Sequence, residues 1–343
     1  MAKISIGLDI GFTSIKVVAL DLSAKLPKVI SFGSIVSPQP GISSEADIEL
    51  EAVATAIKNL LQAAKIEGNE VTIALPESKI FTRVIDDLPP LTDKELASAI
   101  TFAAEEFIPL PVSELSLNYQ VLSRSKEKTS KTVVLVVGSP TGLINKYIKV
   151  LNLSNLKPKA IETEIIAAAR SLVGNNPLSP TTLILQMGAS TTDFAAVSHG
   201  MIWQTRSIAT GGLALTRALA AHLNFELPQA EEYKKTYGLV QDALAGKVFE
   251  GLKPVADIIV GETRRVIQSY ETKYPQDKIK RVILSGGGSK LPGFVIYFAN
   301  NLGVEVQDGD PWAMLAKEPA LSAKLASAGS LYTVAVGLAL REQ

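Results

Sequence analysis

The sequence predicts an α/β protein made of two similar lobes with a cleft between them. Its 343 residues are enough for about two domains. Alternating apolar residues, typical of strands, are interspersed with segments of helical periodicity. A short pattern also occurs twice, at Leu8–Ser14 and Leu185–Thr191: apolar, polar, apolar, Gly, any residue, then two hydroxyl residues. Because each copy falls in the turn of a predicted hairpin, we expect a duplicated fold with two loops facing each other across the cleft.

Composition narrows the chemistry that is available to such a cleft. Hydrophobic residues make up 47% of the chain, and 34 basic residues balance 34 acidic ones. This favours a large core and gives no net positive field for nucleic acid or an anionic membrane. Cysteine is absent and the only histidines are His199 and His222, which excludes disulfides, thiolate chemistry and a three-His metal site. Carboxylates, lysines, hydroxyls and backbone amides remain, and these groups suit phosphate binding.

The first half of the chain is expected to contain a hairpin and a compact βαββα unit. Alternating residues from Ile4 to Ala19 form the hairpin around Gly11. Thr92 and Glu95 predict a capping box at the start of the helix in the βαββα unit, since each side chain can satisfy a free backbone amide. The other predicted elements are a helix at 53–64, a strand at 71–75, strands near 80–85, 115–122 and 133–137, and helices ending at 107, at 143–151 and at 160–172.

The second half is expected to repeat the opening hairpin, over Leu183–Val197. A turn at Gly211-Gly212, helices to about residue 274, a strand at 281–284, a loop at Gly286–Gly288 and further helices follow. Asp9 and Lys16 interrupt the N-terminal apolar stretch, so no signal peptide is expected. No apolar run reaches the roughly 18–20 residues of a spanning helix, so we expect a cytoplasmic protein without direct membrane insertion.

The two repeated loops have the groups that a bound nucleotide requires. Backbone amides around glycine approach phosphates closely, a lysine offsets their charge, and a carboxylate holds Mg²⁺ through water. Taken singly, every one of these features has an ordinary structural explanation. Glycine-threonine hairpin turns are common, a triple glycine also makes a tight strand-to-helix turn, and Glu164, Glu231 and Lys234 also fit a solvated surface.

Taken together and in this order, the motifs resemble those of the actin-like ATPase superfamily, which includes actin, DnaK-type chaperones and FtsA. The resemblance covers essentially the whole chain and implies a duplicated, ribonuclease H-like fold. Asp9–Ser14 is similar to the first phosphate motif, Gln186–Asp193 to the second and Ile283–Pro292 to the adenosine motif. Glu164–Ala169 and Tyr332–Leu340 resemble the two connecting helices.

The resemblance implies ATP or ADP as cofactor, with Mg²⁺. It assigns catalytic roles to Glu164 and Asp9, and a metal held through water by Asp9 and Gln186. The second motif normally begins with Asp, and the neutral Gln186 coordinates a hydrated Mg²⁺ less well, so weak or absent hydrolysis is expected. The nucleotide-binding residues implied are Asp9, Gly11, Phe12, Thr13, Ser14, Lys16, Gly188, Ala189, Ser190, Thr191, Thr192, Gly211, Gly212, Glu231, Lys234, Gly286, Gly287 and Gly288.

Within this superfamily the chain is most similar to the PilM family of type IV pilus assembly proteins. The segments that carry this likeness are Arg83–Pro89, Lys94–Leu96, Glu105–Pro111 and Asn118–Leu122. The chain also stops at Gln343, where FtsA continues into a linker and an amphipathic membrane helix. The implied subdomains are 1A (1–78, completed by 159–178 and 326–343), 1C (79–158), 2A (179–212 and 280–325) and 2B (213–279).

This resemblance implies a cytoplasmic ATP-binding scaffold of the type IV pilus inner-membrane platform. Its expected partner is the N-terminal tail of a PilN-like membrane protein, docked in a groove between 1A and 1C, with other platform proteins and a second copy of the chain as further partners. The helix from Leu96 to Phe107 is one candidate groove wall, although these residues fit core packing equally well. The alternatives are an FtsA-like filament-forming protein, a sugar or acetate kinase on the same fold, and a scaffold that binds no nucleotide.

Overall fold

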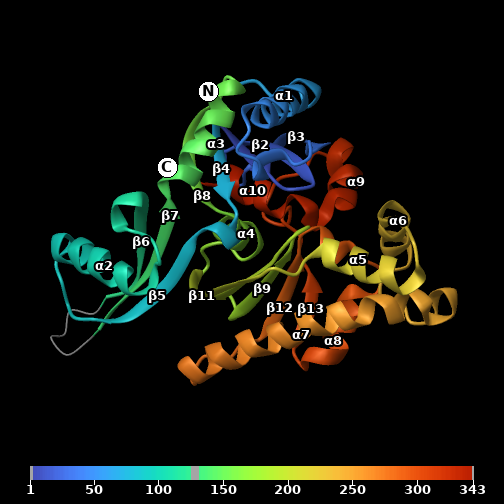
Figure 1. Cartoon of the computed structure of the whole chain (residues 1–343). Coiled ribbons are helices and arrows are strands. Elements are labelled where there is room, and N and C mark those ends of the chain that lie inside the picture. Colours follow the sequence, from blue (N-terminus) through green and yellow to red (C-terminus); the bar gives the residue numbers. More distant parts are fainter. Residues whose placement is uncertain (1–2, 125–130, 342–343) are drawn as a thin grey trace.

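The computed structural model describes residues 3–124 and 131–341 and shows two lobes, each built on a five-stranded sheet. The strand orders are β3-β2-β1-β4-β8 and β11-β10-β9-β12-β13. In both sheets the first three strands of the order pair antiparallel and the last three pair parallel. The duplication that the repeated pattern predicted is therefore a duplication of topology, and Figure 1 shows the lobes one above the other.

The strands alternate with helices that cover the sheets and connect the lobes. The strands are β1 (Ile4–Ile10), β2 (Ser14–Asp21), β3 (Lys28–Val36), β4 (Glu70–Leu75), β5 (Phe81–Leu88), β6 (Leu115–Ser123), β7 (Thr132–Pro140), β8 (Lys157–Thr163), β9 (Thr182–Met187), β10 (Thr192–Ser198), β11 (Met201–Ile208), β12 (Arg281–Ser285) and β13 (Glu305–Asp308). The α-helices are α1 (Asp47–Ala63), α2 (Asp93–Phe107), α3 (Thr141–Leu153), α4 (Glu164–Leu172), α5 (Gly212–Leu223), α6 (Leu227–Tyr237), α7 (Lys247–Lys273), α8 (Phe294–Leu302), α9 (Pro319–Ala328) and α10 (Thr333–Ala339).

The predicted βαββα unit forms a separate three-stranded sheet, ordered β5-β7-β6, at one side of the first lobe. The capping box is present: Thr92 accepts from the Glu95 amide, and the Glu95 carboxylate accepts from the Thr92 amide. Helix α2 buries Leu96 and Ile100 against one face of this sheet. The opposite face contributes Leu122 and Leu135 to a cluster with α4 and the second sheet. This small sheet is therefore held against both lobes.

Two features of the first half differ from the sequence-based expectation. Residues 157–163 form β8, whereas a helix was predicted from residue 160; the strand forms because Ala160–Thr163 pair with Thr72–Leu75 of β4. Helix α3, predicted as part of the βαββα unit, buries Tyr147, Val150 and Leu151 in the core of the first lobe. The proposed subdomain boundaries remain a prediction.

The helices α4 and α10 cross so closely that only glycine fits at the contact. A Cβ atom on Gly337 would lie 1.8 Å from the Ala167 carbonyl oxygen, and one on Gly7 of β1 would lie 2.1 Å from the Ala335 oxygen. Arg170 stabilises this helix crossing. It donates to the Gly337 carbonyl at 2.7 Å and to the two carboxylate oxygens of Glu162 at 2.6 and 2.7 Å. The two connecting helices therefore form one rigid junction beneath the first sheet.

In the described part of the chain, one helical segment, Pro319–Ala339, is long and apolar enough to cross a membrane. The expectation that no apolar segment reaches the length of a membrane-spanning helix was therefore wrong, as judged by length and composition alone. Half of its most apolar window is buried, and all seven residues of α10 lie in the core. A core helix passes the same test of length and composition, and that is the role in which α10 is found here.

The close crossing predicts that Gly337→Ala is strongly destabilising. The added methyl group meets backbone rather than a movable side chain, so the free energy of unfolding should fall by about 3 kcal/mol. Gly261→Ala in α7 is the matched control, because no atom lies within 4 Å of its added Cβ. Removing a helical glycine there should raise the unfolding free energy by about 0.8 kcal/mol. Urea denaturation followed by circular dichroism measures both; equal effects would contradict the packing described.

Candidate functional site

The two repeated turns have the same backbone geometry. In the first turn the Gly11 amide donates to the Ser14 carbonyl at 3.2 Å, and in the second the Gly188 amide donates to the Thr191 carbonyl at 2.9 Å. Each turn ends the hairpin that opens its lobe, β1–β2 or β9–β10. Side chains at the base of both turns act electrostatically on Glu164, the first residue of α4. The two turns therefore converge on the start of the first connecting helix.

An ion pair closes the base of the first turn. Asp9 lies opposite Lys16 in the β1–β2 ladder, and their side chains approach to 3.2 Å with Asp9 only 6% exposed. The turn itself is bonded to the loop after β3, where the side-chain amide of Gln39 donates from Nε2 to the Phe12 carbonyl at 2.7 Å. The structure thus brings Asp9 and Lys16, two of the predicted site residues, into direct contact.

In the second turn the charges are arranged differently. Gln186 occupies the register position of Asp9, and opposite it Asp193 occupies that of Lys16. The Asp193 carboxylate accepts from the hydroxyls of Ser207 at 2.5 Å and Thr191 at 3.2 Å. The Gln186 Oε1 atom is buried and has no hydrogen-bond partner among the described residues. The negative charge of this turn therefore lies on β10 rather than β9.

Four carboxylates surround the junction of the two turns. Burial raises the pKa of Glu77 to about 7, with a further contribution from Asp193. Burial also raises the pKa of Asp193 to about 6, against the effect of its two hydroxyl donors. The pKa of Glu164 is raised by burial and by Asp9, Asp193 and Glu77, with Lys16 opposing. In the chain outside the uncertain segments, no three acidic or histidine side chains form a metal-binding group.

Glu77 was not identified from the sequence. It follows Pro76 at the end of β4, it is 5% exposed, and its Oε2 atom has no partner within the described ranges. No local motif marks it; only the convergence of β4 with the second lobe brings this carboxylate near Asp193. Asp193 itself was noted as following the second loop but was not among the predicted site residues, although the hairpin register with Gln186 could have identified it.

The residues around Gly211 are tied directly to the second turn. The amides of Gly212 and Leu213 at the start of α5 donate to the carbonyls of Gly188 and Ala189 at 2.9 and 2.8 Å. A Cβ on Gly211 would lie 2.7 Å from both of these carbonyl oxygens. The second turn and the start of α5 therefore form a single unit in which Gly211 has no room for a side chain.

Lys234 connects α6 to the same unit. Its ammonium group donates to the Gly212 carbonyl at 3.0 Å, to Thr216 at 2.8 Å and to Glu231 at 2.6 Å, and only 5% of the residue is exposed. Burial lowers the pKa of Lys234, while Glu231 acts to raise it. A solvated charged face, the alternative explanation of this motif, is wrong for Lys234. The structure places its ammonium group beside Gly212, at the start of α5, and its role toward a nucleotide stays a prediction.

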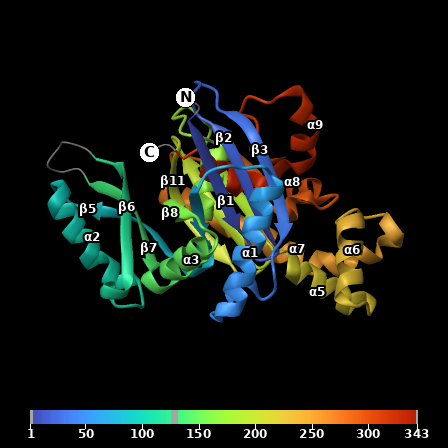
Figure 2. The same ribbon diagram turned by 90° about the horizontal axis from the view of Figure 1, so that it is seen from above.

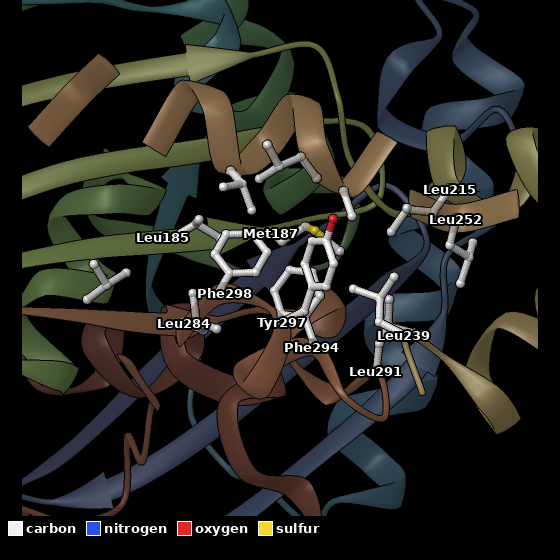
Figure 3. Packing of buried hydrophobic residues seen from close by; sticks show 14 of the residues in the cluster. Leu185, Met187, Leu215, Leu239, Leu252, Leu284, Leu291, Phe294, Tyr297 and Phe298 are labelled. Carbon is white, nitrogen blue, oxygen red and sulfur yellow. The ribbon is translucent and has the colours of Figure 1, made fainter. Parts of the chain in front are cut away.

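Only one of the three glycines at 286–288 has free space beside it. A Cβ on Gly286, which has φ +82°, would lie 2.3 Å from the Met187 carbonyl, and one on Gly288 would lie 1.9 Å from the Met187 side chain. Met187 is itself buried in the second-lobe core, in one cluster with Leu185 and the aromatic side chains of α8 (Figure 3). At Gly287 the nearest atom to an added Cβ is Leu331 Cδ2, 3.7 Å away. Packing thus explains two glycines and leaves the third open.

The duplicated lobes, the paired turns and the crossed connecting helices define an actin-like ATPase fold. MreB 5 of Spiroplasma citri bound to AMPPNP has this fold, with a TM-score of 0.54 and 15% identity over 98% of this chain and 95% of that chain. The cell division protein FtsA of Enterococcus hirae is 22% identical over 88% of this chain and 77% of its own length.

The family can also be stated. The profile of the family described as type IV pilus assembly protein PilM matches residues 7–343, and the chain belongs to this family. A solved structure named the PilM-PilN type IV pilus biogenesis complex is similar over 98% of both chains, with a TM-score of 0.86 and 27% identity. The resemblance inferred from the sequence motifs is therefore confirmed for both the superfamily and the family.

The carboxylate cluster predicts a stability that falls as pH rises. The pKa of Glu77 is about 7 in the folded protein against 4.5 for an unperturbed Glu, so between these values the folded state holds more protons. The free energy of unfolding should therefore decrease from pH 5 to pH 8, with up to about 3 kcal/mol from Glu77 at about 1.4 kcal/mol per pKa unit.

Glu77→Gln removes this titration and tests its origin. The variant should show a flatter pH profile and should be more stable than the wild-type chain at pH 8, as measured by urea denaturation from pH 5 to 8. Glu105→Gln, on the exposed face of α2, is the control and should retain the wild-type profile. An unchanged slope in Glu77→Gln would refute the assignment.

Proposed function

We propose that this protein is a cytoplasmic, ATP-binding scaffold of the type IV pilus inner-membrane platform. The observation that carries the proposal is the pair of identical turns converging on α4, in a chain of the PilM family. Solved neighbours of the same fold are named with AMPPNP or ADP bound. The scaffold is expected at the inner face of the membrane, held there through its partner.

The residues present fit a nucleotide. Gln186 Oε1 is a buried acceptor without a partner in the described structure, and close packing does not explain Gly287, where an added Cβ would meet no atom nearer than 3.7 Å. We propose that the two turns hold the phosphates through their amides and hydroxyls, with Lys16 offsetting the charge. Gly287, Glu231 and Lys234 then lie toward the adenosine. A bound nucleotide with Mg²⁺ supplies the negative charge that these groups neutralise.

Hydrolysis is expected to be weak or absent. Asp9 keeps its charge paired with Lys16, and Gln186 brings no charge to the position opposite. Raised pKa values at Glu164 and Glu77 leave these carboxyls protonated over more of the neutral range than ordinary glutamates. A site that stabilises a developing charge poorly holds nucleotide without turning it over quickly. We therefore propose a structural role for ATP, with Glu164 and Asp9 as the residues of any residual activity.

Gly287 allows a test of nucleotide binding, because an added Cβ there makes only an ordinary van der Waals contact with Leu331. Gly287→Val should weaken Mg-ATP binding at least tenfold, because its side chain enters the space proposed for adenosine. Gly142→Ala, where no atom lies within 4 Å, is the control and should bind as the wild-type chain does. Calorimetric titration measures affinity, and phosphate release on the same samples should be slow. Equal affinity of Gly287→Val and wild type would contradict the placement.

We further propose that the chain binds the N-terminal tail of a PilN-like membrane protein in a groove between subdomains 1A and 1C. Support comes from the similar complex, whose name includes PilN. Helix α2 does not offer the wall suggested by its apolar residues, since Leu96 and Ile100 are at most 2% exposed and lie in the core of the small sheet. The tail must therefore contact other side chains along the boundary of this sheet and the first lobe.

Photo-crosslinking of a tail peptide tests this location. A synthetic PilN-like tail carrying benzoylphenylalanine should label residues within 1–158, identified by mass spectrometry, and a scrambled tail should not. Phe102→Ala removes an exposed aromatic side chain from the outer face of α2, 69% exposed, and should leave the labelling unchanged. Labelling confined to residues 179–325 would place the partner on the second lobe and reject the groove.

A further inference from the structure

A second surface with the features of a binding site lies on the first lobe, outside the proposed PilN groove; it borders the proposed nucleotide site at Leu331, whose Cδ2 atom is the nearest neighbour of an added Cβ on Gly287. A cavity of about 760 Å³ runs along β3, between the C-terminal end of α1 and helix α9. Figure 2 shows β3 at the outer edge of its sheet with α9 beside it. None of the residues that line the cavity belongs to 79–158, the unit proposed to form the PilN groove.

The floor of this cavity is an open strand edge. The segment before α9 covers only the start of β3, where the Val29 amide donates to the Ala316 carbonyl at 3.2 Å. Further along, the Ser37 backbone amide donates to the Thr13 carbonyl. In an antiparallel ladder every second residue bonds to the neighbouring strand. The backbone N–H and C=O groups of Phe32, Ser34 and Val36 therefore point away from β2. These groups have no backbone partner among the described residues, and such a row is a template for another strand.

The two walls of the cavity carry positive charge. Lys65 follows α1 on one side and Lys324 lies in α9 on the other, and no acidic residue lines the cavity. Neither lysine takes part in an ion pair within the structurally described chain. Ile30, Leu321 and Leu331 add apolar surface between them. The groove therefore combines strand-like hydrogen bonding, small apolar contacts and two cations whose charge is not neutralised by a nearby acid.

We propose that an extended acidic segment of a partner protein docks in this groove as an added strand on β3. The open part of the edge accepts about five residues at roughly 3.3 Å each. Because neighbouring residues of a strand point to opposite faces, two adjacent acidic residues would meet Lys65 on one wall and Lys324 on the other, and the aliphatic residues that follow pack on Ile30 and Leu331. Main-chain hydrogen bonds to β3 supply affinity that does not depend on sequence, while the two lysines select for negative charge.

Charge selection is tested with a matched pair of labelled peptides in fluorescence anisotropy with the full chain. One peptide repeats Glu-Glu-Val-Val, which presents acids to both walls, and the other repeats Lys-Lys-Val-Val. The acidic peptide should bind at least tenfold more tightly than the basic one. Lys65→Glu combined with Lys324→Glu should weaken it at least tenfold. Lys58→Glu, an exposed lysine elsewhere on α1, should change affinity by less than twofold. Equal binding of both peptides, or an unaffected double variant, overturns the proposal.

Strand addition is tested separately from charge. Ser34→Pro removes an amide that points away from β2, so it should leave the ladder intact and still weaken the acidic peptide at least tenfold, whereas Ser34→Ala should not. If the proline variant unfolds, the acidic peptide with alternate amides N-methylated replaces it and should bind equally poorly to the wild-type chain. Undiminished binding of the methylated peptide would show purely electrostatic attachment and reject strand addition.

Discussion

The close crossing of α4 and α10 is the contact on which the rest of the structure depends. Each helix leaves one lobe and packs on the other, and they approach backbone to backbone because Gly337 has no side chain facing Ala167. Arg170 and Arg341 both bind the buried Glu162 beside this crossing, so the junction is held by charge as well as by packing. With the helices fixed in this way, α4 begins between the two turns, and everything proposed for the site follows from where that helix starts.

The pseudo-symmetry of the two lobes is complete in topology and broken in chemistry. Both hairpins place a polar pair at the base of the turn, but one pair is Asp9 with Lys16 and the other is Gln186 with Asp193. The first pair is internally neutral, and the second carries a carboxylate that hydroxyl groups stabilise and burial opposes. A duplicated fold can thus keep its shape while its two halves differ in electrostatics, one holding a neutral ion pair and the other a buried acid with a raised pKa.

Local sequence patterns predicted the elements that carry their own signals, such as alternating apolar residues, helix caps and proline breaks. The hairpins, β4, β12 and α2 with its capping box were all found where alternation, caps and proline breaks indicated. The strands β3, β8, β11 and β13 were not predicted; all four are edge strands, and β8 and β13 form by parallel pairing with β4 and β12 rather than in a hairpin. The site followed the same division. Motif residues such as Asp9, Lys16 and Lys234 were proposed from the resemblance, whereas Glu77 joins the carboxylate cluster only through its burial beside another segment, which no local pattern records.

Lys234 has a mechanical consequence for the cleft. Its three hydrogen bonds, together with those from Gly212 and Leu213 to the second turn, join α5, α6 and that turn into one body. Among the described residues the first turn makes no such hydrogen bonds to a helix; its bonds go to Lys16, Ser37 and Gln39, within its own sheet and the following loop. A rotation of one lobe relative to the other would therefore leave the second turn, α5 and α6 unchanged among themselves and would change only the distance between the two turns.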